Sequence, residues 1–457
     1  MTMIVNPRIK WRWEGDKVLL STLAIMNKTA GEVLELLETT NDTKKIADTL
    51  HGRYPSVRLD KLESDVEVIV SQFQKFNIIV PEEYDAESLL TIHATCTEDI
   101  ASVFNNTLSA PVGVACMLTY NCNQKCLHCY TLSPVKVSNE LKTHEWKRVL
   151  DELSELRVFY TIFAGGEPLV YRDIVELVGY ASNKRLNPAI ATNAYLLNEK
   201  KIEELITAGI RGFLISLDGA TAEVHDTFRR SKGSFDRTVN AVSICVEREI
   251  DAVVLATITQ MNVHQITDIM ELADTLGVRR LSLVKLRKSG RAVSNYSLQL
   301  SPHEYVELLK KIYEKEQELQ KTSVLYPDLP AVYFEKSIGV NHYEELKASG
   351  RIELCGAGIV GCVVSPSGDV RPCDASGDIS VGNVRENSVK HIWDTSVLFK
   401  KLREIKKSDI HPCNTCRLHD TCLMGCRALP VQVGDTGDIY RADPLCEECY
   451  TTFGGEK

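Results

Sequence analysis

The chain has 457 residues, of which 44% are hydrophobic and 25% charged, with a formal net charge of -9 and a pI near 5.8. This length suits two or three globular domains, and the acidic balance provides no basic footprint for nucleic acid or an anionic membrane. The N-terminus has no signal-peptide pattern and no apolar run approaches a bilayer span, so we expect a cytoplasmic protein without nucleic-acid or membrane partners.

Residues 1–85 predict a small α+β domain of winged-helix type. A β-hairpin is expected over residues 9–20, with its turn at Glu14-Gly15-Asp16. Three helical patterns and a closing strand follow, at residues 27–37, 44–51, 59–73 and 78–80. Residues 86–110 are expected to form a linker.

Residues 111–300 alternate between strand-like and helical patterns. The expected strands cover residues 112–118, 161–163, 189–192, 213–217, 252–258 and 280–284. Repeated βα units predict a parallel sheet, open or closed as a barrel, with its active site at the carboxyl ends of the strands. Residues 301–350 are expected to form a helical bridge, and residues 351–457 consist mainly of loops, turns and cysteines.

Fifteen cysteines are distributed very unevenly along the chain. None occurs in the first 95 residues, three lie between 122 and 129, and nine fall between 355 and 449. In a long chain without an export signal, so many cysteines indicate metal ligands rather than disulfides. We therefore expect most of them to be thiolate ligands.

Cys122, Cys126 and Cys129 follow the first strand of the alternating region, with spacings of three and two residues. Three cysteines can hold a cubane iron-sulfur cluster and leave its fourth iron open to a substrate or cofactor. The alternative is a structural zinc site that uses the same cysteines and His128.

These cysteines match the motif of the radical S-adenosylmethionine (AdoMet) superfamily, in the loop where that family places it. After the next strand, Gly165-Gly166-Glu167-Pro168 resembles the family's turn, in which small residues let the backbone approach the methionine amino group of AdoMet. The resemblance assigns further cofactor contacts to Tyr130, Asn193, Ser216, Arg229 and Arg237.

The choice between Arg229 and Arg237 as the partner of the AdoMet carboxylate stays open at this point. A guanidinium suits a carboxylate because it donates two parallel hydrogen bonds. The family pattern has glycine after the first of these arginines, whereas this chain has Arg230. The chemistry implied by the resemblance is reductive cleavage of AdoMet to a 5′-deoxyadenosyl radical that abstracts hydrogen from substrate, fed by a flavodoxin- or ferredoxin-type electron donor.

The C-terminal cysteines resemble the seven-cysteine signature of the SPASM domain, which holds auxiliary clusters in many radical AdoMet enzymes. The matching positions are Cys355, Cys373 after Gly368, Cys413, Cys416, Cys422, Cys426 and Cys446. A pair of zinc knuckles is the alternative. The resemblance implies two auxiliary clusters and therefore three [4Fe-4S] clusters in all. One auxiliary cluster would use Cys355, Cys362, Cys373 and Cys426, and the other Cys413, Cys416, Cys422 and Cys446.

Two ligand assignments stay open. If Cys362 is not a ligand, the first auxiliary cluster has an open iron that could bind a substrate thiolate. Cys449 could replace Cys446 in the second. Cys116 and Cys245 fit buried structural roles, and Cys96 in the linker has no assigned role.

The N-terminal domain resembles the RiPP recognition element, a winged-helix domain that takes a leader peptide as an added strand on the exposed edge of its hairpin. A DNA-binding winged helix is the alternative, but residues 1–81 contain eleven Lys or Arg and eleven Asp or Glu and carry no basic stripe. A structural cap is a third possibility.

The whole pattern predicts an α/β enzyme with three parts. An N-terminal winged-helix domain precedes a partial (β/α)6 radical SAM barrel, and a loop-rich SPASM domain follows. We expect a maturase that cross-links a ribosomally made precursor peptide through a thioether or a carbon-carbon bond. The alternatives are a SPASM enzyme acting on a tetrapyrrole or a protein side chain, and a winged-helix regulator that holds iron-sulfur clusters or zinc.

Overall fold

The computed structural model describes residues 3–6, 9–21, 25–75, 78–81, 108–352, 355–427 and 439–453. The chain divides into two compact units, residues 1–96 and residues 97–457. Cys96 and most of the expected linker lie outside the described residues.

The N-terminal unit contains the expected hairpin, formed by β2 (Trp11–Glu14) and β3 (Lys17–Leu20), with Gly15 in the left-handed conformation at the turn. β4 (Ile25–Met26) pairs with the other edge of β3, so the hairpin becomes a three-stranded antiparallel sheet. The three expected helices are confirmed as α1 (Lys28–Leu37), α2 (Thr43–Arg53) and α3 (Leu59–Lys75). β1 (Met3–Val5) pairs with β5 (Ile79–Pro81). The sequence patterns had not indicated the short strands β1 and β4.

α1 packs closely against the hairpin. It begins after Asn27, whose side chain accepts a hydrogen bond from the backbone N–H of Ala30 (2.9 Å) and so caps the helix. A Cβ at Gly31 would lie 2.5 Å from Cγ2 of Val18 and 2.7 Å from the Trp13 ring. Glycine is therefore required where the helix crosses the sheet. Val18 lies in an apolar core that all three helices share.

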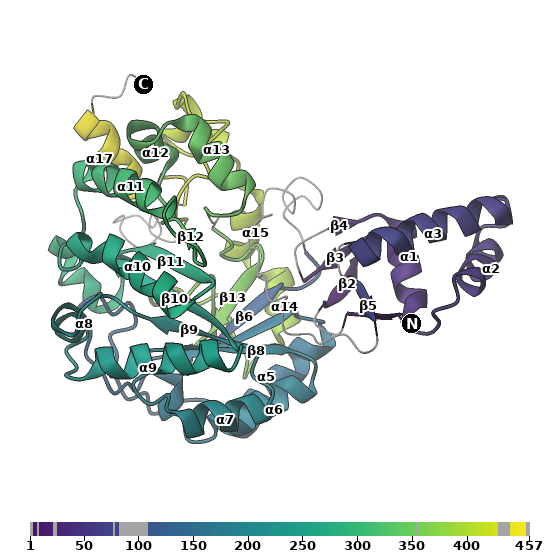
Figure 1. Ribbon diagram of the computed structural model, residues 1–457, viewed down its shortest axis with the longest axis horizontal. Helices are drawn as coiled ribbons and strands as arrows, with labels where there is room; N and C mark the ends of the chain where they lie inside the picture. Colours follow the sequence, from purple (N-terminus) through teal and green to yellow (C-terminus); the bar gives the residue numbers. More distant parts are fainter. Residues whose placement is uncertain are drawn as a thin grey trace. The chain divides into compact units, whose positions relative to one another are not determined.

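The larger unit is built on a ten-stranded sheet (Figure 1). Its six central strands run parallel in chain order and confirm the six expected strands. They are β6 (Gly113–Thr119), β7 (Tyr160–Gly165), β8 (Asn187–Thr192), β9 (Gly212–Ser216), β10 (Asp251–Ile258) and β11 (Arg280–Lys285). The order in the sheet follows the order in the chain, as expected for consecutive βα units.

Helices cover the outer face of this sheet (Figure 1). They are α5 (Thr143–Glu155), α6 (Ile174–Asn183), α7 (Glu199–Thr207), α9 (Ser234–Glu247) and α10 (Ile266–Leu276), with the short α8 (Ala222–Arg229) after β9. Burial alternates residue by residue along β10, where Val254 and Ala256 are fully buried. Leu255 and Thr257 instead face the inside of the curved sheet.

The sheet continues into the C-terminal third of the chain. β12 (Ser323–Leu325) extends it beyond β11, within the segment expected to be a helical bridge, beside α11 (Pro302–Glu316), α12 (Ala331–Ser337) and α13 (Val340–Ala348). On the opposite side, β13 (Gly361–Val364) pairs in parallel with β6, and β14 (Asp369–Arg371) and β15 (Gly382–Asn383) follow antiparallel. The cysteine-rich region therefore shares one sheet with the barrel.

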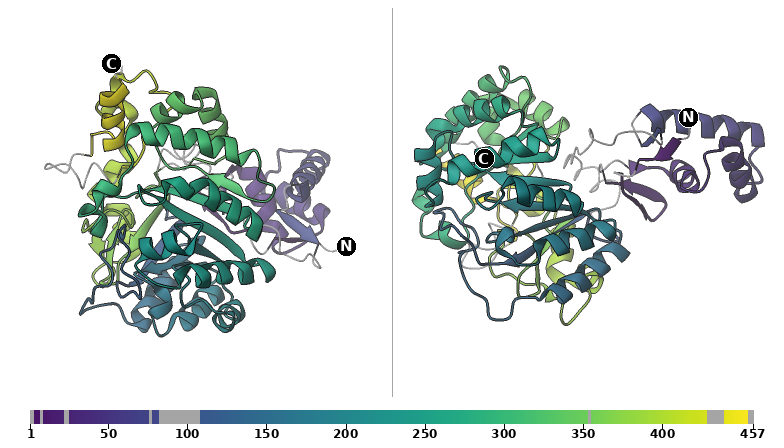
Figure 2. Two further views of the ribbon diagram at one scale, coloured as in Figure 1. Left: turned by 60° about the vertical axis from the view of Figure 1, so that its left-hand side comes forward. Right: turned by 60° about the horizontal axis from the view of Figure 1, so that its bottom comes forward.

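Among its described residues, the C-terminal region also contains α14 (Val389–Thr395), α15 (Val397–Glu404) and α17 (Pro444–Phe453). α17, yellow in Figures 1 and 2, packs against α11 and α12. Among the helices of the described residues, none has the length and apolar character that crossing a bilayer requires.

Candidate functional site

The carboxyl ends of the parallel strands surround a cavity of about 360 Å³. Nine of the residues expected to hold a cluster or AdoMet lie on its wall: Cys122, Cys126, Cys129, Tyr130, Gly165, Gly166, Asn193, Ser216 and Arg229. Parallel strands bring the loops that follow them to one edge of a sheet, which explains how residues from four different loops meet here.

The loop with Cys122, Cys126 and Cys129, here called the cluster loop, is fixed from several sides. The side chain of Asn193 donates to Oδ1 of Asn123 (2.8 Å), and the backbone N–H of Arg291 donates to the carbonyl of Cys129 (2.7 Å). Burial, with further contributions from Glu167 and the other two thiols, raises the pKa of Cys122 to about 12. A cationic metal centre would remove the penalty for ionising these neighbouring thiols.

Gly165 and Gly166 are required by the cluster loop itself. A Cβ at Gly165, which has a φ of +142°, would lie 2.3 Å from the carbonyl oxygen of Thr119, and one at Gly166 would lie 2.3 Å from that of Asn121. The backbone N–H of Gly166 donates to Thr119 (2.7 Å). The expected reason for these glycines was close approach to AdoMet. The structure adds a different one, because the turn after β7 packs directly on the backbone that leads into the cysteines.

Glu167 and Pro168 lie behind the cavity wall. Glu167 is fully buried, and its carboxylate accepts hydrogen bonds from Oγ1 of Thr192 (2.7 Å) and from the backbone N–H groups of Asn193 (2.8 Å) and Leu169 (3.0 Å). Burial raises its pKa to about 7. Pro168 begins a short 3-10 helix, Pro168–Val170. Glu167 therefore ties the turn after β7 to the end of β8, and neither Glu167 nor Pro168 lines the cavity.

Arg229 forms a buried ion pair at the cavity wall. Its Nη2 lies 2.5 Å from Oδ2 of Asp218, and its Nη1 lies 3.8 Å from Sγ of Cys126. Its Nε is buried and has no hydrogen-bond partner among the described residues. His128, whose side chain is 10% exposed, stacks on Phe228 with 4.3 Å between ring centroids and is kept neutral because desolvation lowers its pKa well below the usual range.

The structure separates Arg237 from the cavity. Arg237 is exposed on α9, where its guanidinium lies 4.3 Å from the centroid of the Tyr195 ring. Of the two candidate arginines, only Arg229 reaches the cavity. Arg230 takes the left-handed conformation (φ 49°, ψ 46°) at the end of α8, which is the conformation that glycine adopts without strain.

A buried network that the sequence did not indicate supports Asp218 and the cluster loop. The backbone N–H of Asp218 donates to Nδ1 of His225 (3.2 Å), so the His225 proton lies on Nε2, which is 3.3 Å from Oγ of Ser234. The side chain of Gln124 donates to the same Oγ (2.7 Å). Burial lowers the pKa of His225 to about 3.

Cys355, Cys373 and Cys426 line a second cavity, of about 210 Å³. Burial, followed by the nearby Asp374, Cys355 and Cys426, raises the pKa of Cys373. The two cavities meet, because both are lined by Val284, Arg287, Asp374 and Ala375.

The structure does not bring Cys362 into this group. Cys362 is buried on β13, opposite Val114 of β6, and it lies near Cys116 and Arg403. Ala115 and Met117 of β6 face the first cavity, so the alternation of the strands turns Cys116 and Cys362 to the other face of the sheet. Among the described residues, the second cavity therefore has three cysteines, without the expected fourth.

Cys413, Cys416, Cys422 and Cys446 form a third group of neighbouring thiols, although among the described residues no three Cys, His, Asp or Glu side chains stand close enough together to hold a metal ion in this structure. Burial, followed by Cys422, Cys413 and Cys416, raises the pKa of Cys446. None of the four lines either cavity. Cys449 is fully buried on α17 beside Lys336 and Glu335, so the structure places Cys446 rather than Cys449 with this group.

Charged residues that the sequence analysis missed lie where the cavities meet. Nζ of Lys285 is 2.5 Å from Oδ2 of Asp443, and both side chains are fully buried. The same Asp443 carboxylate accepts the backbone N–H of Cys426 (2.8 Å). Nη1 of Arg287 is 2.8 Å from Oδ2 of Asp328. Lys285 and Arg287 end β11 and follow it, a position that could have identified them, because the other sites also follow strand ends.

Tyr130 lines the first cavity near Asp374, which lines both cavities. It follows Cys129 in the cluster loop, and its hydroxyl lies near the carboxylate of Asp374, which follows Cys373. Burial raises its pKa well above the usual range. Tyr130 is therefore a neutral hydroxyl between the first cysteine group and the second.

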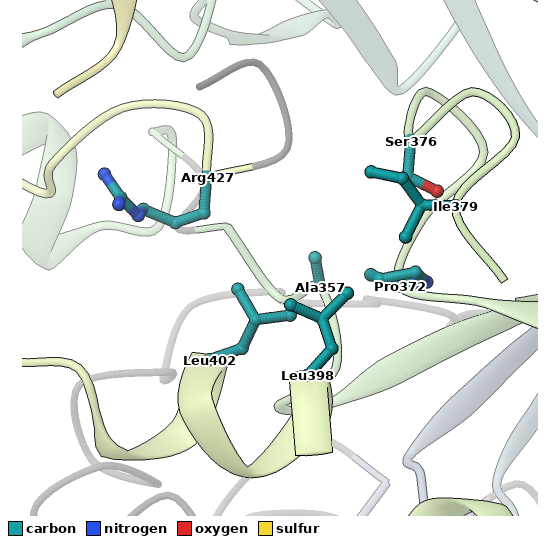
Figure 3. Close-up of a pocket in the computed structure, with 7 residues that line it drawn as sticks. All are labelled: Ala357, Pro372, Ser376, Ile379, Leu398, Leu402 and Arg427. Carbon is teal, nitrogen blue, oxygen red and sulfur yellow. The ribbon is translucent and has the colours of Figure 1, made fainter. Parts of the chain in front are cut away.

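Apolar packing supports the second cysteine group from behind (Figure 3). Leu398 and Leu402 of α15 meet Ala357 and Pro372, which lie close in sequence to Cys355 and Cys373, around a small pocket. The Arg427 guanidinium points away from these side chains in Figure 3 and donates to the carbonyls of Arg441 and Ile439. It thereby links the residue after Cys426 to the segment before Asp443.

Comparisons with known proteins match this geometry. Residues 117–276 match the radical SAM superfamily, and residues 355–417 match SPASM, an iron-sulfur cluster-binding domain. The AdoMet-dependent heme synthase of Methanosarcina barkeri is 32% identical over 349 residues, which cover 74% of this chain and 97% of the synthase. The chain belongs to the radical SAM superfamily.

A second curated relative of this radical SAM enzyme is a maturase. Mycofactocin maturase MftC of Mycobacterium ulcerans is 31% identical over 364 residues, which cover 78% of this chain and 93% of the maturase. The fold resembles that of Streptococcus suis SuiB bound to precursor peptide SuiA, with a TM-score of 0.67, 17% identity and coverage of 97% of this chain and 100% of SuiB. As a member of this superfamily, the chain binds AdoMet and holds iron-sulfur clusters in its radical SAM and SPASM domains.

Proposed function

We propose that this radical SAM enzyme is a maturase that installs a cross-link, a thioether or a carbon-carbon bond, in a ribosomally made precursor peptide. The observation that carries the proposal is the extent of the fold likeness. The sequence similarity to the heme synthase covers 74% of this chain. The structural similarity to peptide-bound SuiB covers 97% of it and therefore includes most of the N-terminal unit.

The residues of the first cavity fit a [4Fe-4S] cluster with AdoMet. Cys122, Cys126 and Cys129 would hold three irons, and the cavity gives access to the fourth. Arg229, with its unpaired buried Nε, would face the AdoMet carboxylate, while Asn193 and Ser216 would contact the rest of the cofactor. When bound, the pair supplies reductive cleavage of the sulfonium and thus a radical that abstracts hydrogen.

Two auxiliary clusters would bring the total to three. Cys355, Cys373 and Cys426 would hold one with an open iron toward the second cavity, and Cys413, Cys416, Cys422 and Cys446 would fully ligate the other. A substrate side chain that extends from the first cavity into the second passes Arg287 and Asp374, which line both. A flavodoxin- or ferredoxin-type protein would supply electrons.

The N-terminal unit would bind the leader of the precursor as an added strand. β4 covers part of the hairpin edge that we expected to be free, so the outer edge of β4 takes that role. Ile25 and Met26 are partly exposed there, whereas Trp11, Arg12 and Glu14 on the other edge strand, β2, are buried. Backbone hydrogen bonds along β4 would provide affinity.

One variant tests the leader site separately from the radical chemistry. Met26→Pro removes a backbone donor and disturbs pairing at β4. We expect leader affinity to fall by at least about tenfold, while AdoMet cleavage without peptide stays unchanged. Unchanged leader affinity in a folded variant would move the leader site away from β4.

A tetrapyrrole-modifying enzyme is the second candidate, because the heme synthase is 32% identical and almost fully covered. Co-production with a precursor peptide encoded beside this chain separates the two functions. Mass spectrometry should show loss of two hydrogen atoms within the core of the peptide if a cross-link forms. An unmodified peptide, together with AdoMet-dependent consumption of a tetrapyrrole, would contradict the proposal and support the second candidate.

A further inference from the structure

Arg237 belongs to an exposed group of cations beside the cluster loop. Lys125 lies within that loop, Arg230 and Lys232 lie between α8 and α9, and Arg237 lies on α9. These four residues, here called the basic surface, are all exposed, and within the described part of the chain none of them has an ion-pair partner. Exposed cations without carboxylate partners are available to an acidic molecule.

Specific contacts join the basic surface to the cluster loop. The backbone N–H of Leu127 donates to the carbonyl of Phe228 (3.4 Å), two residues before Arg230. Gln124, beside Lys125, donates to Ser234 (2.7 Å), two residues after Lys232. The connection between α8 and α9 therefore packs directly against the loop that carries Cys122 and Cys126.

The third contact leads to Arg237. Its guanidinium stacks on Tyr195, whose backbone N–H donates to Oδ1 of Asn193 (3.0 Å), and Asn193 in turn donates to Asn123 of the cluster loop. Stacking restricts the guanidinium to one region of the surface, which reduces the entropy that a bound partner would have to remove.

Arg230 ends α8 in the left-handed conformation, which Arg157 and Arg185 also adopt elsewhere in the chain. Glycine adopts this conformation without strain. The chain instead places a long cationic side chain there, exposed and unpaired.

The charge of the whole chain makes this surface distinctive. The formal net charge is -9, so an acidic protein is repelled by most of the molecule. The helices that flank the basic surface expose three carboxylates, Glu223, Asp236 and, at the C-terminal end of α9, Glu247, against the four cations, which leaves the region positive. An acidic partner would be steered to this side of the cluster loop.

We propose that the basic surface docks a small acidic electron-carrier protein, of flavodoxin or ferredoxin type, beside the cluster of Cys122, Cys126 and Cys129. One electron passes at each encounter: the carrier's flavin or iron-sulfur centre is oxidised by one electron and the cluster is reduced by one. No bond forms or breaks in this step. The proposal rests on membership of the radical SAM superfamily and is independent of the peptide substrate.

A second exposed basic pair provides a matched control. Lys400 and Lys401 lie on α15, in the auxiliary-cysteine region, and neither belongs to a segment that contacts the cluster loop. If electrons entered through the auxiliary clusters instead, this pair would be the better candidate.

The test compares Arg230→Gly/Lys232→Ser with Lys400→Ser/Lys401→Ser in the reconstituted full chain. Glycine at 230 suits the left-handed backbone, so the first variant should fold and load iron like the native chain. Each enzyme is reduced in turn by a reduced flavodoxin of net negative charge and by dithionite, and 5′-deoxyadenosine is measured without any peptide. Affinity for the oxidised flavodoxin is measured calorimetrically at two salt concentrations.

We expect the first variant to lose about tenfold in flavodoxin-driven rate and affinity at low salt, with a weaker salt dependence. Its dithionite-driven rate should stay within about twofold of the native rate, and the α15 variant should match the native chain throughout. Equal flavodoxin affinity and rate in the first variant, or a loss confined to the α15 variant, would overturn the proposal. So would a loss of precursor-peptide affinity in the first variant with flavodoxin binding intact, which would make the basic surface a peptide site.

Discussion

The cysteine groups of this radical SAM enzyme differ in what surrounds them. Cys122, Cys126 and Cys129 line one cavity, and Cys355, Cys373 and Cys426 line a second that meets the first. The group of four, Cys413, Cys416, Cys422 and Cys446, lines neither cavity. Groups of three sulfurs thus coincide with space for another molecule, and the group of four does not.

This difference separates two kinds of contribution to function. A three-sulfur site leaves an iron for a cofactor or substrate and must be held rigidly around open space, whereas a four-sulfur site can be closed and can crosslink the chain. Buried ion pairs support the open sites: Arg229 with Asp218 at the first cavity, and Lys285 with Asp443 where the two cavities meet.

Loss of one sulfur from the first open site should have the largest effect. We expect Cys126→Ser to abolish 5′-deoxyadenosine formation and to lower the iron content by about four atoms. Cys245→Ser is the control, because Cys245 is buried in α9 away from the cavities. Iron analysis and chromatography of the reaction products measure both effects. Full activity in Cys126→Ser would contradict the assignment of the open site.

Removal of the cation between the two open sites should destabilise the fold. Lys285→Met leaves the carboxylate of Asp443 buried without its partner, which typically costs 3 to 5 kcal/mol. Arg248→Met, which breaks an exposed pair with Glu199, should cost about 1 kcal/mol or less. Denaturant unfolding of the anaerobic proteins compares them. Equal costs would mean that the pair of Lys285 and Asp443 is not sealed from water.

The group of four cysteines leads us to expect different effects at two neighbouring cysteines on α17. Cys446→Ala should lose about four irons and lower the melting temperature, by about 2 to 4 °C for each kcal/mol lost. Cys449→Ala should retain the iron and change stability only through its packing. If Cys449→Ala loses the iron instead, the ligand of this site is Cys449 rather than Cys446.

Acid should weaken the support of the first open site through His225. Its folded pKa of about 3 lies below the unfolded value of about 6.5, so the unfolded chain binds more protons and stability falls as the pH drops below 6.5. Between pH 7 and pH 5 this residue alone should remove about 2 kcal/mol. His225→Gln should lack that component in the iron-free protein. An identical pH slope in both proteins would show that His225 protonates freely in the fold.

Local sequence patterns predicted the first open site better than the two auxiliary cysteine groups. Cys122, Cys126 and Cys129 lie within an eight-residue stretch that follows a strand, and their spacing together with the Gly165-Gly166-Glu167-Pro168 turn after the next strand carried the prediction. Cys362 was placed in a ligand set by its position in the sequence, but the register of β13 against β6 turns it to the other face of the sheet.

Contacts between distant segments had no local signal. Lys285 and Asp443 are 158 residues apart, and nothing around either residue indicates their pairing. The glycines Gly165 and Gly166 were identified, but the backbone that they approach follows only from the packing of one loop on another. Arg229 and Arg237 looked equivalent in the sequence, and only the orientation of α8 and α9 separates them.

Anaerobic reconstitution of the native chain and of Cys362→Ala tests the central claim most directly. Iron per chain is counted, and 5′-deoxyadenosine is assayed after reduction in the presence of AdoMet. We predict about twelve irons in both proteins and cleavage of AdoMet by both, because two open sites and one closed site hold three cubanes without Cys362. Bound zinc with little iron and no cleavage, or loss of about four irons in Cys362→Ala, would contradict this account.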